Sequence, residues 1–330
     1  MFKLKPSEFM TDTDSPVEKM KVFFNESYVA PIHGFDTTRK SKWIVDQLLK
    51  TDGDEGLEVE ITDPCNYREE AEKLIMETHS REYVDALLTG SPTKLSESQG
   101  FGWDPGIWDM SLNSTAGIIA AVNHLTEASG RGVTINAGSL SSGLHHARSG
   151  RGSGYCTVNG LAIGALTARD ILRKSAQPGH VVILDVDAHC GGGTHSLIGQ
   201  SENILHLDLS VNAFDSYEPI NKNKLIILNS PSDEEYLSNL SDLLQKIPSD
   251  TRLLLYNAGM DPYPTVSQEL LKRREDLVSE WCKEVGIPVV FVLAGGYLGA
   301  FSKSELVDAH LCTIEAFSSI HRKDLSHGAN

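Results

Sequence analysis

One short segment of the chain carries two acidic residues and a histidine at alternating positions, Asp185-Val186-Asp187-Ala188-His189. It directly follows the apolar residues 181–184, which are typical of a buried strand. Residues i, i+2 and i+4 of an extended chain point the same way, so we expect Asp185, Asp187 and His189 to project from one face. Burying an unpaired carboxylate is costly, and such groups are therefore paired or bind a metal.

Three further segments place polar side chains after predicted strands. They are Gly143-Leu144-His145-His146, Asn257-Ala258-Gly259-Met260-Asp261 and Gly295-Gly296-Tyr297. In open α/β sheets, ligands bind beyond the carboxyl ends of the strands. Asp187, His189 and Asp261 could supply O, N and O ligands to a zinc-like ion and leave one position open for water. For the Asp-x-Asp-x-His string alone, a hydrogen-bonded Asp/His network is the alternative.

Short β-branched runs alternate with amphipathic helical patterns along most of the chain. The predicted strands cover residues 21–24, 133–136, 181–187, 203–209, 225–228, 252–257 and 288–293. Helices are predicted over 113–129, capped by Asn113 or Ser114, over 157–174, and along the apolar stripes of 270–285 and 306–317. Several strands are continuous apolar runs, typical of a parallel sheet covered on both faces. We therefore predict an α/β fold, a single-domain open parallel sheet with helices on both faces, spanning 1–330 with 1–18 as a peripheral extension.

Composition excludes several other classes of protein. The 330 residues are 40% hydrophobic and 22% charged, and the formal net charge is −16. This acidity argues against direct nucleic-acid binding, because phosphate contacts need clustered Lys and Arg. The five cysteines form no CxxC pair, and no segment resembles a signal peptide or a membrane span. We expect an intracellular protein, cytoplasmic, or nuclear if its source is a eukaryote.

Taken together and in order, these motifs resemble the zinc-dependent histone deacetylase family, within the arginase/deacetylase superfamily. The resemblance rests on Gly143–Ala147 with its two histidines, Gly154-Tyr155-Cys156-Thr157-Val158-Asn159, the Asp185–His189 string, Asp261 and Gly295-Gly296-Tyr297. It spans about residues 20 to 320. His33-Gly34-Phe35-Asp36 looks more like the class IV branch.

The resemblance implies an arginase/deacetylase-like fold and hydrolysis of an acyl amide by metal-activated water. Asp187, His189 and Asp261 match the family's metal ligands, so it implies one Zn²⁺ per chain, with Fe²⁺ as an alternative. Asp185 matches the carboxylate that partners the first histidine, and a monovalent cation such as K⁺ is implied near it.

The same resemblance assigns the remaining groups of the site. His145 and His146 match the histidine pair, with His146 as the expected general base, and Tyr297 matches the tyrosine that polarises the scissile carbonyl. Gly154 and Tyr155 match a wall of the substrate channel. The implied substrate is an acylated lysine in a protein or peptide, or another acylated amine.

The chain also departs from the family pattern. Cys190 stands where many members have a second histidine, and Gly160 where an Asp often follows the Asn. Gly192 stands where the family has the Asp or Asn that orients the second histidine. Losing that partner leaves the tautomer and the pKa of His146 undetermined. His195 is a nearby candidate for a substitute.

Three alternative functions follow from these residues. A binuclear ureohydrolase of the arginase type needs Asp at the positions of Gly191 and Gly259, and is therefore disfavoured. A catalytically weak or inactive acyl-lysine-binding module is favoured by Gly192 but disfavoured by the intact metal ligands. An acylpolyamine deacetylase would use the same metal site.

Overall fold

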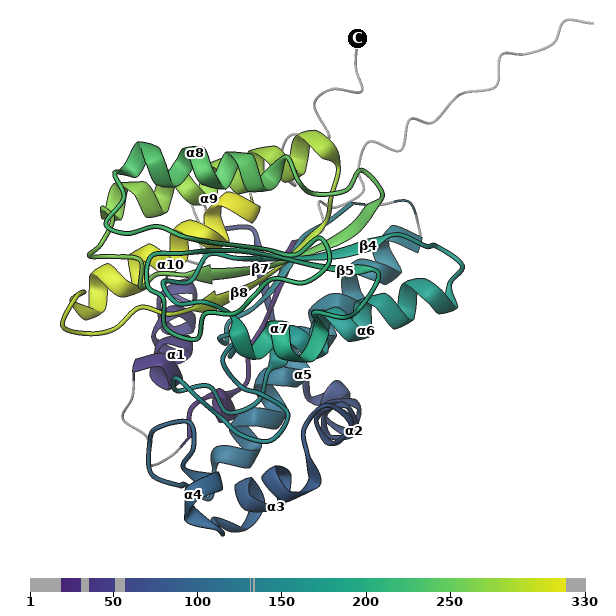
Figure 1. Ribbon diagram of the computed structural model, residues 1–330, viewed down its shortest axis with the longest axis vertical. Helices are drawn as coiled ribbons and strands as arrows, with labels where there is room; N and C mark the ends of the chain where they lie inside the picture. Colours follow the sequence, from purple (N-terminus) through teal and green to yellow (C-terminus); the bar gives the residue numbers. More distant parts are fainter. Residues whose placement is uncertain (1–18, 31–35, 51–56, 131, 133, 319–330) are drawn as a thin grey trace, which may run out of the picture.

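Eight parallel strands form one sheet in the computed structural model, which describes residues 19–30, 36–50, 57–130, 132 and 134–318. Their order across the sheet is β2-β1-β3-β8-β7-β4-β5-β6 (Figure 1). The strands are β1 (Met20–Phe23), β2 (Val59–Thr62), β3 (Ala137–Ser139), β4 (His180–Asp185), β5 (Ile204–Ser210), β6 (Lys224–Ile227), β7 (Thr251–Gly259) and β8 (Val289–Ala294). This confirms the predicted α/β fold with a parallel sheet. The sequence segments 1–18 and His33-Gly34-Phe35 lie outside the described residues.

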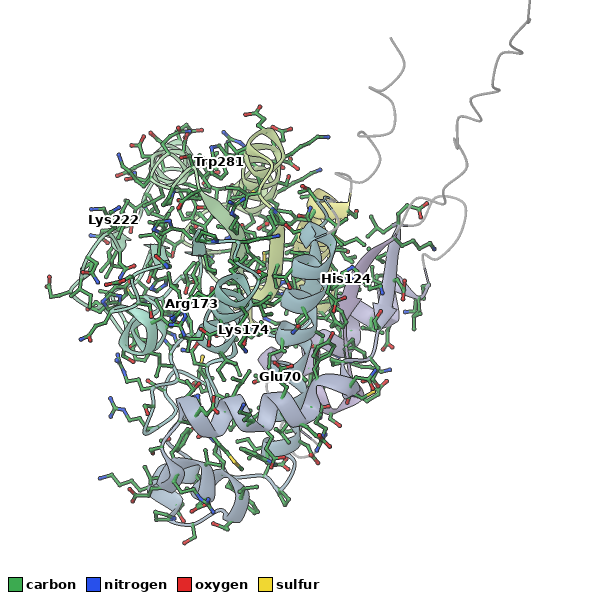
Figure 2. All side chains as sticks on the ribbon, turned by 90° about the vertical axis from the view of Figure 1, so that its right-hand side faces the viewer. Glu70, His124, Arg173, Lys174, Lys222 and Trp281 are labelled. Carbon is green, nitrogen blue, oxygen red and sulfur yellow. The ribbon has the colours of Figure 1, made fainter. Side chains whose placement is uncertain are left out.

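Helices cover both faces of the sheet. In Figure 1, α8, α9 and α10 lie on one face, α5 and α6 lie on the other, and α2, α3 and α4 pack outside α5. The helices are α1 (Asp36–Leu48), α2 (Arg68–Thr78), α3 (Arg81–Thr89), α4 (Thr93–Ser96), α5 (Ile107–Gly130), α6 (Gly160–Lys174), α7 (Gly192–Ile198), α8 (Asp233–Leu244), α9 (Gln268–Val285) and α10 (Lys303–Ser318), with 3-10 turns at Glu26–Tyr28 and Cys65–Tyr67. Figure 2 shows the same layers through Trp281 of α9, Lys174 of α6 and Glu70 of α2.

Most predicted strands are found within a few residues of their expected bounds. The predicted 133–136 strand is wrong, because residues 134–136 are not extended in the sheet and Val133 lies outside the described residues. Its place is taken by β3, whose sequence Ala-Gly-Ser carries no strand signal. A Cβ at Gly138 would overlap the ring of Phe291, so the contact with β8 requires glycine there. The edge strand β2 was not predicted.

The predicted helices are found, with different starting points. α5 begins at Ile107, so the predicted cap at Asn113 or Ser114 is wrong; both residues lie inside the helix, and Asn113 Nδ2 donates to the carbonyl oxygen of Asp109 at 2.7 Å. α6 begins at Gly160, and Asn159 caps it by accepting from the amide of Ala162 at 2.9 Å. None of the helices that the structure describes is both long and apolar enough to cross a bilayer.

Candidate active site

The site lies where the carboxyl ends of β3, β8, β7 and β4 meet. These four strands are neighbours in the sheet and all run in parallel, so their following loops emerge at one edge. β4 ends at Asp185, two residues earlier than predicted, and Asp187 and His189 lie in the loop that follows. The amide of Asp187 donates to Asp185 Oδ1 at 3.2 Å and the amide of His189 donates to Asp187 Oδ1 at 3.0 Å. The aspartate side chains therefore hold the loop's shape themselves.

Asp187, His189 and Asp261 converge as a candidate metal centre. One ligand atom from each lies within 4.8 Å of the others. His189 Nδ1 is 3.2 Å from Asp187 Oδ1 and 3.3 Å from Asp261 Oδ2. Asp261 Oδ2 is buried, and apart from its contact with His189 it has no hydrogen-bond donor among the described residues, as expected of a metal-ligand atom. These three residues fit a divalent ion.

The protonation of His189 agrees with this geometry. Burial lowers its pKa, but hydrogen bonds to Asp187 and Asp261 outweigh burial and raise the pKa to about 10 in the metal-free chain. A proton on His189 therefore occupies the place between two carboxylates that a bound cation would take.

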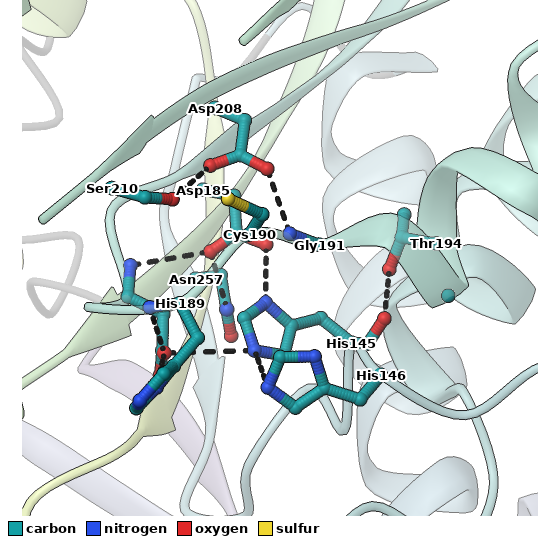
Figure 3. A network of polar contacts seen from close by, with 12 residues as sticks. His145, His146, Asp185, His189, Cys190, Gly191, Thr194, Asp208, Ser210 and Asn257 are labelled. Carbon is teal, nitrogen blue, oxygen red and sulfur yellow. Dashed lines mark hydrogen bonds and ion pairs between the residues drawn. The ribbon is translucent and has the colours of Figure 1, made fainter. Parts of the chain in front are cut away.

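His145 is held by a buried carboxylate on β4. Its Nδ1 donates to Asp185 Oδ2 at 2.7 Å, and Asn257 Nδ2 donates to Asp185 Oδ1 at 2.7 Å (Figure 3). Burial lowers the pKa of His145, but Asp185 and Asp187 outweigh it and raise the pKa to about 10. The predicted pairing of His145 with Asp185 is present in the structure.

His146 lies directly beside His145. The two Nε2 atoms are 3.0 Å apart, so one of them carries a proton and the other accepts it (Figure 3). Burial and the neighbouring His145 lower the pKa of His146 to about 4. His146 is therefore the member of the pair that stays neutral near pH 7.

The other ring nitrogen of His146 contacts a residue that the sequence analysis did not name. Nδ1 of His146 lies 3.0 Å from Oδ2 of Asp215, which is in the loop after β5. His195, the suggested substitute partner, instead stacks its ring on Tyr217 with centroids 4.1 Å apart. Asp215 was missed because no local motif links it to His146, and only its position just beyond a strand end could have pointed to it.

The histidine pair faces a cavity of about 630 Å³. It is lined by Ser98, Gln99, Gly100, Ser142, His145, His146, Gly154, Tyr155, Cys156, Asp187, His189, Phe214, Gly295 and Tyr297. Gly154 and Tyr155, which the resemblance assigns to a wall of the substrate channel, both line this cavity. Gly154 has φ +50°, and a Cβ there would lie 2.9 Å from the ring of Phe214, so a larger residue would fill the channel.

Tyr297 is half-buried and lines the same cavity. The turn before it needs glycine twice, because Gly295 and Gly296 have φ +51° and +80°. A Cβ on Gly295 would also lie 2.9 Å from Oδ2 of Asp261. This turn thus packs directly against the candidate metal centre.

A second buried polar group lies behind His145. Asp185, His206 and Asp208 each offer one atom within 4.8 Å of the others, and all three are fully buried. Burial and the nearby Asp185 raise the pKa of Asp208 to about 6. Of these three residues only Asp185 was predicted from the sequence, and a monovalent cation near it stays a prediction.

The structure also shows why Gly191 and Gly259, the positions where a binuclear centre would need Asp, carry no side chain. A Cβ at Gly191 would lie 2.8 Å from Asp185 Oδ2, and one at Gly259 would lie 3.0 Å from Cβ of Asp187. Side chains at these two positions do not fit beside the aspartates already there.

Comparison with known proteins agrees with this geometry. The histone deacetylase domain matches residues 33–314. Histone deacetylase 2 of Arabidopsis thaliana is 27% identical over 314 residues, covering 86% of this chain and 76% of the relative. An uncharacterized protein of Picosynechococcus is 30% identical over 232 residues, covering 66% of this chain and 73% of the relative.

Two solved structures share the fold. The HDA15 HD domain superposes with a TM-score of 0.66 at 18% identity, covering 91% of this chain and 90% of that domain. An acetylpolyamine aminohydrolase from Burkholderia pseudomallei has a TM-score of 0.67 at 17% identity, covering 91% of this chain and 99% of its own. With the domain match over most of its length, the chain belongs to the histone deacetylase family and is a metal-dependent deacetylase.

Proposed function

We propose that this deacetylase acts on acyl-lysine side chains, with Asp187, His189 and Asp261 holding the catalytic cation. The observation that carries the proposal is the convergence of these three ligand atoms beside the cavity that His146 and Tyr297 line. The ligand set of two carboxylates and one imidazole suits Zn²⁺, with Fe²⁺ as the alternative. A cation held by these residues would supply Lewis-acid chemistry to the acyl carbonyl and to a water molecule.

The histidine pair moves the proton. His146 takes the proton of the attacking water at Nε2 and returns it to the amine nitrogen as the C–N bond breaks. Asp185 holds His145, whose Nε2 lies 3.0 Å from Nε2 of His146, and this contact keeps the His146 ring in place. Burial and the neighbouring His145 lower the pKa of His146, so the base itself stays neutral.

Tyr297 stabilises the oxygen on which negative charge develops. Two carboxylate ligands make a bound dication a weaker electrophile than three neutral histidines would, so a second donor is needed at the carbonyl. Tyr297 lines the cavity beside the candidate metal centre, and its hydroxyl is the donor we assign to this role.

The cavity favours acyl-lysine over an acylpolyamine. Tyr155 and Phe214 give it apolar walls, and among the residues seen to line it Asp187, a proposed metal ligand, is the one carboxylate. An acylated lysine places an uncharged butyl chain between the amide and the backbone. An acylpolyamine would bring an ammonium group into the same channel without a counter-charge, which is costly.

The test is a comparison of substrates on zinc-loaded protein. We expect kcat/KM for an acetyl-lysine peptide to exceed that for N8-acetylspermidine by at least about tenfold, because an unpaired ammonium costs more than 1.4 kcal/mol. His146→Ala, prepared in parallel, controls for contaminating hydrolases. A preference for N8-acetylspermidine would favour the acylpolyamine alternative. Hydrolysis of neither substrate at full metal occupancy would contradict catalysis by this site.

All five cysteines are unpaired in the structure, in keeping with the intracellular location proposed from the sequence.

A further inference from the structure

The partner of His146 comes from a different part of the chain than the family pattern supplies. Asp215 lies in the loop after β5, and its side chain is 8% exposed. Oδ2 accepts from His146 Nδ1 at 3.0 Å and from the amide of Gly193 at 3.0 Å. Oδ1 accepts from Nη2 of Arg148, whose Nη1 also donates to the carbonyl oxygen of Gly192 at 3.1 Å. A carboxylate with this many donors is held in one orientation.

Gly192 and Asp215 compete for the same space. A Cβ added at Gly192 would lie 2.8 Å from Asp215 Oδ1 and 2.9 Å from Arg148 Nη2, and it would lie closer still to the backbone oxygen of Asp215. A side chain at position 192 is therefore incompatible with the present position of Asp215. The backbone of Asp215 has φ +59°, which a residue other than glycine adopts only when its surroundings enforce it.

We infer that Asp215 positions His146 in this chain, and that residue 192 is glycine because Asp215 occupies the space a side chain there would need. The carboxylate that contacts this histidine comes from the loop after β5, whereas the family pattern has it at the start of α7. This inference rests on the proposed role of His146 as the base.

The contact has a defined chemical consequence. A carboxylate at Nδ1 fixes the tautomer in which Nδ1 carries the proton and Nε2 presents its lone pair. Nε2 is the atom that faces His145 Nε2, and the ring lines the cavity. Without Asp215, the ring has no acceptor at Nδ1 among the contacts seen in the structure, and both tautomers become accessible. Burial raises the pKa of Asp215, but the contacts with His146 and with Arg148 outweigh burial and lower the pKa, so the carboxylate stays ionised.

The first experiment separates positioning from folding and binding. Asp215→Ala in zinc-loaded protein should lower kcat for an acetyl-lysine peptide about 10–100-fold, the usual effect of removing such an outer partner. KM and zinc content should stay within about twofold of the parent. Asp215→Asn keeps an oxygen acceptor and should retain most of the activity. Ser216→Ala, an exposed position in the same loop, is the matched control. A kcat within twofold of the parent for Asp215→Ala would overturn the inference.

The second experiment moves the carboxylate. Asp215→Gly removes the carboxylate and frees the loop backbone, whose oxygen is the atom nearest to a Cβ at position 192, to shift. Adding Gly192→Asp to it should recover at least about a third of the kcat lost by Asp215→Gly alone. Gly192→Asp by itself should be strongly impaired because of the clash with Asp215. A double variant no more active than Asp215→Gly, at equal zinc content, would contradict the exchange of the two positions.

A third measurement stays informative if the proposed function fails. In ¹⁵N-histidine-labelled protein, the His146 resonance, assigned by its loss in His146→Gln, should report a protonated Nδ1 and an unprotonated Nε2. Asp215→Ala should shift it toward a mixture of tautomers. An unchanged spectrum would overturn the positioning role whether or not acyl-lysine is the substrate.

Discussion

The guanidinium of Arg274 donates a 2.6 Å hydrogen bond to the backbone carbonyl oxygen of Gly259. The same Nη1 donates to the carbonyl oxygen of Val186 at 3.3 Å. Val186 immediately precedes Asp187, and Gly259 lies two residues before Asp261, so one side chain of α9 joins the two loops that carry the proposed carboxylate ligands. Arg274 is fully buried, and its charge is paired with Glu275, with Nε to Oε1 at 3.0 Å.

Arg274→Ala should therefore be strongly destabilising. It leaves the buried carboxylate of Glu275 without its partner, which typically costs about 3–5 kcal/mol of unfolding free energy. Its neighbour Arg273 is exposed and pairs loosely with Glu234 at 3.8 Å, so Arg273→Ala should cost about 0–1 kcal/mol. Urea unfolding of both variants and the parent measures the difference. Equal midpoints for the two variants would show that the buried pair contributes little.

Asp261→Ala should remove most of the bound metal. The variant keeps two of the three converging ligands, which is an incomplete site for a divalent ion. Metal analysis of protein reconstituted with zinc should give one ion per chain for the parent and well below one for the variant. Asp276→Ala, an exposed aspartate on α9, is the control and should bind like the parent. Two ions per parent chain would contradict the single centre.

Tyr297→Phe should lower kcat about 10²–10³-fold, the loss of about 2.7–4 kcal/mol expected for one oxyanion donor. The ring stays in the cavity wall and the hydroxyl donor is deleted. Zinc content should be unchanged, because Tyr297 is not among the converging ligands. Steady-state kinetics at measured metal occupancy provides the test, and activity within about twofold of the parent would sink the assignment.

Acid should destabilise the protein through His79. Its Nδ1 donates to the carbonyl oxygen of Arg148 at 2.9 Å and its Nε2 accepts from the amide of Asn159 at 3.2 Å, so the folded state holds the neutral ring. Burial lowers the pKa of His79 to about 4. The unfolded chain, with a pKa near 6.5, binds the proton first, so stability is lost as the pH falls from about 6.5 toward 4.

We expect this residue to contribute on the order of 2 kcal/mol to the loss of stability between pH 7 and pH 5. His79→Gln should be less stable than the parent at pH 7 but lose less on acidification. Denaturant unfolding of both proteins at the two pH values measures the contribution, and metal release at low pH is common to both and cancels. Equal pH dependence would show that His79 titrates normally in the folded state.

The sequence by itself determined the parts of this protein that are encoded in contiguous segments. The apolar runs of β4, β7 and β8 predict buried parallel strands, and the polar residues that follow each run predict where the ligands gather. Asp187, His189 and Asp261 could be named because each lies just beyond a strand end, and parallel strands bring such ends to one edge. The alternation of strand and helix patterns is also read from contiguous segments, and it predicts a parallel sheet with helices on both faces.

Only the tertiary structure decided the features that depend on space shared by distant segments. β3 has no strand signal in its sequence, because the ring of Phe291 takes the room a side chain at Gly138 would need. Asp215 lies 69 residues from His146 along the chain, and their contact exists because the loop after β5 folds over Gly192. In the sequence, the glycine at position 192 and the carboxylate at position 215 look unrelated. In the folded chain they are coupled, because a side chain at 192 and the present position of Asp215 would need the same volume.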